Sequence, residues 1–176
     1  MKDMAILELT GHVHQALLSH LLPKRQRAEE VAFVFAVADG AAILRQVDWM
    51  AVPESGFVSR SLFHLELTDE TRGTVIKRAH DLGSSLVEFH SHAGTWPAQF
   101  SASDLAGFDE FVPHVRWRLK GRPYVSVVVS RTGFDGFIWT TDSIVPDRLA
   151  GISVDGRVLQ PTALSPLYWD HDDGKD

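Results

Sequence analysis

Two histidines separated by one serine, followed at fixed spacing by a serine and an aspartate, are the residues of this chain best suited to hydrolytic chemistry. His90, Ser91 and His92 are followed, after a gap of eight residues, by Ser101, and Asp104 stands three positions later. Histidines at i and i+2 near a strand end point to the same face, so their imidazoles can converge on one ion. Asp104 is expected to supply a third ligand, because the intervening loop is long enough to fold back over the strand end. The pattern therefore predicts a metal site.

The expected cofactor is one zinc ion held by His90, His92 and Asp104. The chain contains no cysteine, so a transition-metal site must be built from imidazole and carboxylate groups. Three protein ligands leave a fourth tetrahedral position for water, as in catalytic zinc sites. Zinc lowers the pKa of that water and polarises a scissile carbonyl, so the expected chemistry is hydrolysis.

Two further residues are expected to take part in the reaction, and each leaves an alternative open. Glu29 and Glu30 stand just before an apolar run, and one of these two carboxylates is expected to act as general base and acid. Strand alternation turns only one of them toward the metal. Ser101 is expected to donate to the developing oxyanion, to cap the next helix, or to do both. The other seven histidines are expected to be surface, strand-face or tail residues, and Trp96 and Phe100 to pack beneath the loop before Ser101.

Together these residues resemble the JAMM or MPN+ metalloproteases, also called the JAB domain. The family pattern is a glutamate at the start of an early strand, a His-Ser/Thr-His triplet, a serine and then an aspartate three positions on. Glu29, the triplet at 90–92, Ser101 and Asp104 stand in these places in the same chain order. Two features depart from the pattern: the gap before Ser101 is one residue longer, and Ala32 stands where glycine is common. The resemblance covers roughly residues 5–141.

The resemblance implies a zinc metalloprotease or isopeptidase that hydrolyses the amide or isopeptide bond after the C terminus of a ubiquitin-like protein. It also implies that the tail of this modifier lies as an extra strand beside the active site. The chain looks most similar to compact prokaryotic JAB proteins of bacterial ubiquitin-like conjugation systems, whose other components would be its partners. Two alternatives stay open: an inactive JAB-like scaffold that binds a protein partner, and a metallohydrolase of a small amide or cysteine adduct in sulfur-carrier processing.

The elements that must position these residues alternate between strands and helices. Apolar or alternating runs predict strands at 4–9, 31–37, 41–49, 61–67, 85–90, 124–130 and 134–141, with a further hairpin around 154–158. Helical spacing predicts helices at 11–22 and 68–82 and from 101 to about 111, the first ended by Pro23 and the last by Pro113. This order predicts an α/β (α+β) single-domain JAB/MPN-like fold, in which about three helices flank a central mixed, mostly antiparallel sheet.

Composition limits the domain organisation and the partners. With 176 residues, of which 44% are hydrophobic, the chain is expected to form one domain over 1–165, followed by an acidic, disordered tail at 166–176. A net charge of −6 without a long basic run argues against a nucleic-acid surface. The chain has no apolar run of membrane-spanning length and no secretory signal at its start, so a cytoplasmic protein without membrane partners is expected.

Overall fold

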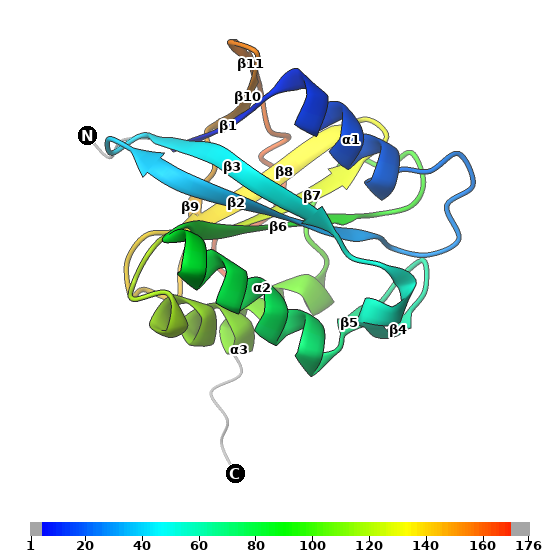
Figure 1. Ribbon diagram of the computed structural model, residues 1–176. Coiled ribbons are helices and arrows are strands. Elements are labelled where there is room, and N and C mark those ends of the chain that lie inside the picture. Colours follow the sequence, from blue (N-terminus) through cyan, green and yellow to red (C-terminus); the bar gives the residue numbers. More distant parts are fainter. Residues whose placement is uncertain (1–4, 170–176) are drawn as a thin grey trace.

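The computed structural model describes residues 5–169, in which helices cover both faces of a large mixed sheet (Figure 1). Helix α1 lies on one face of the sheet, and α2 and α3 lie side by side on the other. The helices are α1 (Gly11–Leu21), α2 (Asp69–Leu82) and α3 (Ala102–Arg118), together with a short 3-10 helix η1 (Glu54–Gly56). The α+β class with a single domain, a mixed sheet and three helices, expected from the sequence, is confirmed.

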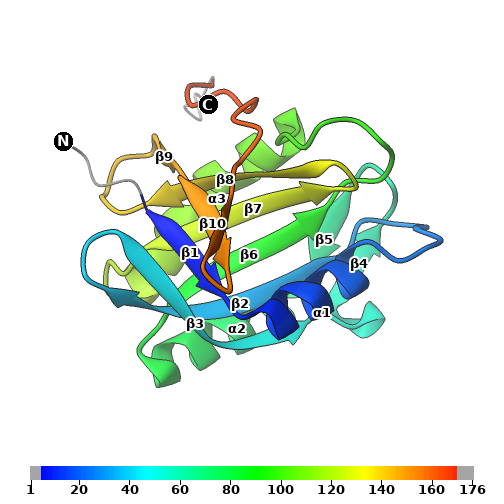
Figure 2. The same ribbon diagram turned by 90° about the horizontal axis from the view of Figure 1, so that it is seen from above.

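The large sheet has nine strands in the order β11-β10-β1-β3-β2-β6-β7-β8-β9. Figure 2 views the sheet from above. Their bounds are β1 (Ile6–Leu9), β2 (Val31–Asp39), β3 (Ile43–Ala51), β6 (Ser85–Ser91), β7 (Tyr124–Ser130), β8 (Gly133–Trp139), β9 (Asp147–Arg148), β10 (Gly151–Val154) and β11 (Arg157–Leu159). Strand β1 pairs in parallel with β3 and β10, and β6 with β7, whereas the other neighbouring pairs are antiparallel. The short strands β4 (Phe57–Arg60) and β5 (Leu65–Leu67) form a separate antiparallel pair.

Strand β2 is buried on both faces, so its alternate residues belong to two different cores. Val31 and Phe33 pack in the core between the sheet and helices α2 and α3, whereas Ala32 and Val34 pack in the core beneath α1. In the neighbouring strand β6, His90 pairs with Val31 and therefore faces the α2 and α3 side. The alternation in these two central strands decides which side chains reach the start of α3.

The prediction of one strand over 61–67 is wrong for residues 61–64. Only Leu65–Leu67 forms a strand, and its partner β4 was not expected from the sequence. Between them the chain turns: the Ser61 N–H donates to the His64 carbonyl at 2.7 Å, and the Ser61 hydroxyl accepts from the Phe63 N–H at 3.1 Å. Phe63 is 86% exposed, so the apolar alternation in this segment does not reflect burial.

Helix α3 runs through Pro113, which was expected to end it. The helix continues to Arg118, and Val115 together with Leu119, just beyond its end, is fully buried. A proline inside a helix costs about 3 kcal/mol. Burial of two large apolar side chains, at about 1.5–3 kcal/mol each, is enough to offset that cost. Pro113 itself is exposed, so its ring displaces no core side chain.

The last described residues lie against the core. Residues 166–169 were assigned to a disordered tail, yet the Trp169 ring stacks on Phe137, with centroids 6.1 Å apart and planes inclined by 9°, and Leu167 packs against the same core. Residues 170–176, on which the rest of that expectation falls, lie outside the described residues, as do residues 1–4. Across residues 5–169, no helix combines the length and the apolar character that crossing a membrane requires.

Candidate metal centre

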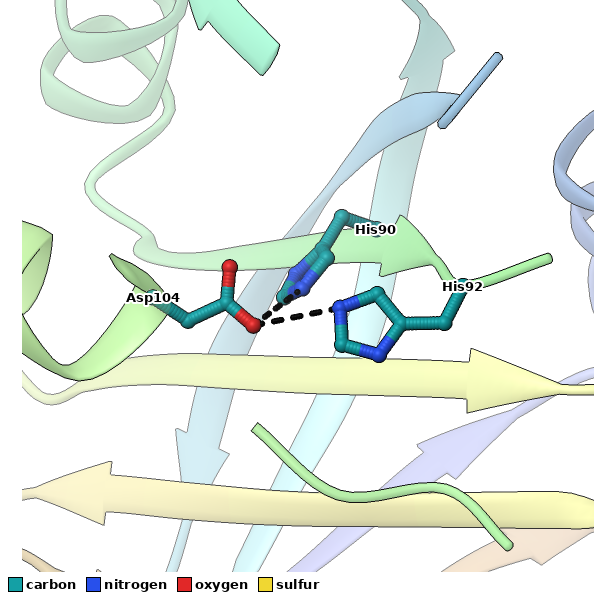
Figure 3. A group of neighbouring side chains, drawn as sticks. All are labelled: His90, His92 and Asp104. Atoms are coloured by element: carbon teal, nitrogen blue, oxygen red, sulfur yellow. Dashed lines mark ion pairs between the residues drawn. The ribbon is translucent and has the colours of Figure 1, made fainter. Parts of the chain in front are cut away.

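Three side chains from two neighbouring elements meet at the end of strand β6 (Figure 3). His90 lies within β6, His92 follows directly after its last residue, and Asp104 lies in the first turn of α3. The Nε2 atoms of both imidazoles lie 3.2 Å from the same Asp104 oxygen, Oδ2. One ligand atom from each of the three residues lies within 4.8 Å of the others, so this group could hold a metal ion.

Strand geometry aims the two histidines at the same point. They are two positions apart, and the His92 N–H donates to the Val129 carbonyl at 2.9 Å, which extends the contact with β7 beyond the end of β6. His90 is 2% exposed, and its ring lies 5.9 Å from that of the buried Phe100. The His90 ring is therefore held by packing, whereas the His92 side chain is 24% exposed and open to solvent.

A capping box at the start of α3 positions Asp104. The Ser101 hydroxyl accepts from the Asp104 N–H at 3.1 Å, and Asp104 Oδ2 accepts from the Ser101 N–H at 2.8 Å. A carboxylate is favoured in this first turn because the free N–H groups and the dipole make the helix start positive. The capping role expected for Ser101 is confirmed, while its role as an oxyanion donor stays a prediction.

The loop between His92 and Ser101 is exposed over much of its length. Residues 94–97 are exposed, and Trp96, expected to pack beneath the loop, is 80% exposed. Phe100 packs as expected: it is 4% exposed, and its N–H donates to the buried Ser165 hydroxyl at 2.9 Å. The end of the loop is therefore fixed immediately before Ser101, whatever the length of the exposed part.

The available donor atoms fit a metal that accepts nitrogen and oxygen ligands. Both ring nitrogens of His90 are buried, and neither has a well-formed hydrogen bond within residues 5–169, although Nε2 lies close to Asp104. Buried polar atoms without a partner are costly and uncommon, and a bound cation at this point would satisfy Nε2. His90 Nε2 and Asp104 Oδ2 are thus close enough to bind a common ion.

The charges in the centre favour a cation. Burial, the largest single effect, lowers the pKa of His90, but the carboxylates of Asp104, Glu88 and Glu29 together raise that pKa to about 9. Burial by itself raises the pKa of Asp104, but His90, His92 and the Ser101 N–H hold it well below its usual range. The carboxylate is therefore ionised at neutral pH, and a metal ion would replace the proton that His90 otherwise carries.

Glu29 lies beside the three ligands, whereas Glu30 faces the other side of the sheet. Glu29 Oε1 is 3.7 Å from His92 Nε2, and the residue is 4% exposed. Burial raises the pKa of the Glu29 carboxyl above its usual value, and the neighbouring imidazoles only partly oppose this. Glu30 forms an ion pair with Arg60 and lies 3.7 Å from His20 of α1. Of the two candidate bases, only Glu29 is at the centre.

Contacts that the sequence analysis missed hold the Glu29 backbone against the ligand strand. The hydroxyl of the fully buried Ser91 accepts from the Glu30 N–H at 3.0 Å and from the Gln26 amide at 2.9 Å. The Glu29 N–H donates to the Ser61 carbonyl at 2.8 Å, which joins the turn between β4 and β5 to the centre. Side chains alternate along a strand, so a serine between two histidines that share a face must point to the opposite face. This alternation alone could have indicated the role of Ser91.

A pocket of about 130 Å³ opens beside the ligands. Its walls include Glu29, Phe63, His64, Glu88, His90 and Asp104. His64 was expected to be an ordinary strand-face residue, but it lies in the turn before β5 and faces the same pocket as Glu29. No local pattern in the sequence indicates that His64 faces this pocket, because its position depends on how the turn between β4 and β5 packs against the rest of the protein.

The chain matches none of the known family models, and no curated protein is similar to it in sequence. Among solved structures, it is similar to the solution structure of protein DSY2949 from Desulfitobacterium hafniense, with a TM-score of 0.55 and 19% sequence identity. The alignment covers 86% of this chain and 94% of that chain. At this level of identity the likeness concerns the fold alone.

Proposed function

We propose that the chain is a zinc-dependent peptidase or isopeptidase of the JAMM type, which hydrolyses the bond after the C terminus of a ubiquitin-like protein. The observation that carries the proposal is the convergence of two imidazole Nε2 atoms and one carboxylate oxygen, with a buried glutamate beside them. Zinc is favoured because two histidines and one carboxylate are a common catalytic ligand set that leaves a position open. The substrate class rests on the resemblance of Glu29, His90, His92, Ser101 and Asp104 to the JAMM pattern.

The three ligands would approach the ion from different sides. His90 would bind from the buried side, and His92 and Asp104 from the side that solvent reaches. Zinc bound here supplies a Lewis acid, which lowers the pKa of water and polarises a carbonyl group. Because the capping box already orients Asp104, little side-chain freedom remains to be lost when the ligands come together.

Glu29 is the group suited to move the proton. Its Oε1 atom lies next to the ligand atoms and can accept a proton from an attacking water, then return it to the leaving amine. Burial raises the pKa of this carboxyl, which brings it closer to that of a base that can also serve as an acid near neutral pH. The hydrogen bond from the Glu29 N–H to Ser61 keeps its backbone in place during both transfers.

Ser101 is suited to donate to the substrate oxygen. Its hydroxyl oxygen accepts from the Asp104 N–H, so the hydroxyl hydrogen is still available for an oxyanion on the exposed side of the helix start. Ser101 would therefore both orient the ligand Asp104 and stabilise the negative charge that develops on the substrate oxygen.

Metal content and chelator-sensitive cleavage test the proposal together. The purified protein should contain one zinc per chain and should cleave at least one member of a panel of ubiquitin-like fusions, and a chelator should stop the cleavage. Asp104→Ala should lose both the zinc and the cleavage. A wild-type protein without bound zinc would contradict the proposal. If the protein binds zinc but cleaves none of the fusions, the peptidase proposal is contradicted, and a small amide substrate or a scaffold role is favoured instead.

A further inference from the structure

Glu88 lies directly behind His90, on the side away from the other ligands. The two residues are two positions apart in β6, so both side chains face α3. Glu88 Oε1 is 4.0 Å from His90 Nδ1, whereas His90 Nε2 faces Asp104. The two nitrogens of this imidazole thus point to two different carboxylates, one on each side of the ring.

Tyr124 of β7 holds the Glu88 carboxylate in this position. Its hydroxyl donates to Glu88 Oε2 at 3.1 Å, and Tyr124 is fully buried. This contact occupies one carboxylate oxygen and leaves the other, Oε1, on the side of His90. Tyr124 thus holds Glu88 with Oε1 toward His90.

We propose that Glu88 is a positioning residue for the metal centre, which accepts the Nδ1–H of His90 and thereby keeps Nε2 free to bind the ion. Two observations carry this inference. His90 Nδ1 is buried without a hydrogen-bond partner in the described part of the chain, and Glu88 presents a carboxylate oxygen to it from the same strand face. The separation of 4.0 Å exceeds a hydrogen bond of about 2.9 Å, so the proposed bond requires the two side chains to approach each other by about 1 Å.

The proton position matters because a neutral imidazole binds a metal only through the nitrogen that carries no hydrogen. A carboxylate can only accept a hydrogen bond, so it favours the His90 tautomer that is protonated at Nδ1. Metal-binding histidines commonly donate their second N–H to such a group, which fixes the ring and makes the ligand more basic. Tyr124 would act on His90 only indirectly, by orienting Glu88.

This inference rests on the proposed zinc site, and the test uses zinc affinity and not turnover as its main readout. Zinc dissociation constants are measured by competition with a chromophoric chelator for wild type, Glu88→Gln and Tyr124→Phe. Matched controls make the same chemical changes at exposed positions, Glu66→Gln and Tyr168→Phe. Thermal unfolding of the metal-free proteins shows whether each variant is folded.

Glu88→Gln should bind zinc about 10-fold to 100-fold more weakly, the usual effect of removing such a partner, because an amide can present a donor to Nδ1 and favour the wrong tautomer. Tyr124→Phe should weaken binding by a smaller factor, since the carboxylate remains but is less well oriented. The two exposed controls should bind as the wild type does. In ¹⁵N spectra of the zinc-loaded wild type, His90 should be protonated at Nδ1.

The outcomes separate this inference from the proposed function. If the wild type binds zinc and Glu88→Gln binds it equally well, Glu88 is only a hydrogen-bond partner of Tyr124 and the inference is overturned. If the wild type binds no zinc, both proposals are overturned. Should Glu88→Gln fail to fold, Tyr124→Phe decides: weaker zinc binding supports the inference, and unchanged zinc binding overturns it.

Discussion

Replacing each of two adjacent glutamates by glutamine gives the sharpest test of the proposed chemistry. Glutamine has the size of glutamate but cannot take up the proton, so Glu29→Gln preserves packing at a residue that is 4% exposed while removing the base. Loss of a general base commonly lowers kcat by about 10²-fold to 10⁴-fold. This corresponds to about 3–5 kcal/mol in the activation free energy. The zinc ligands are unchanged, so the zinc content should stay at one per chain.

Glu30→Gln is the matched control, because it makes the same change one residue away on the opposite face. Glu30 pairs with Arg60, and both side chains are less than one-fifth exposed. Loss of this pair should therefore lower the free energy of unfolding by about 1–3 kcal/mol. It should leave kcat within about one order of magnitude, since Glu30 does not face the ligands.

The assay is single-turnover cleavage of the fusion that the wild type cleaves best, with zinc analysis and thermal unfolding of each variant. A Glu29→Gln protein that keeps most of its turnover would refute the assignment of the base. A loss of turnover confined to Glu30→Gln would show that the strand alternation had been assigned to the wrong face.

The remaining predictions concern the metal, the charges and the helix α3. Zinc at about 1,000 times its dissociation constant should raise the free energy of unfolding by about 4 kcal/mol, and melting curves of Asp104→Ala should show little of this gain. In a chelator, the pKa of His90, about 9 against an ordinary 6.5, means that its stabilisation is complete below pH 6.5 and is lost as pH rises through 9. The loss should be at most about 3 kcal/mol, and denaturant titrations of Asp104→Asn should lack this pH dependence. Ser101→Ala should lose about 1 kcal/mol of stability as a helix cap. If Ser101 also donates to the oxyanion, kcat should fall by about 10²-fold to 10³-fold, and an unchanged kcat would leave it as a cap only. Pro113→Ala should raise the free energy of unfolding by about 1–2 kcal/mol, because it restores a backbone donor inside α3, and a lower melting temperature would contradict this.

Most of the secondary structure could be predicted from the sequence where local signals agree. The run from Tyr124 to Ser130 forms a strand at the expected bounds, and helix α2 begins after Thr68 and ends at Gly83, which adopts the left-handed conformation suited to glycine. The predictions were wrong where tertiary contacts outweighed the local signal. Buried residues on both sides of Pro113 carry α3 through the proline, and the exposed Phe63 lies in a turn despite its alternating neighbours.

The sequence by itself determined the types and the order of the groups at the centre, because strand alternation and the first turn of a helix are local geometries. Two histidines two positions apart on a strand share a face, and the Ser101 and Asp104 spacing is compatible with a helix cap. Only the tertiary structure decided that Glu29, and not Glu30, lies beside the ligands, and that Glu88 and Tyr124 stand behind His90. These placements depend on which face of β2 and β6 meets α3, and that is set by how segments far apart in the sequence bury their apolar side chains.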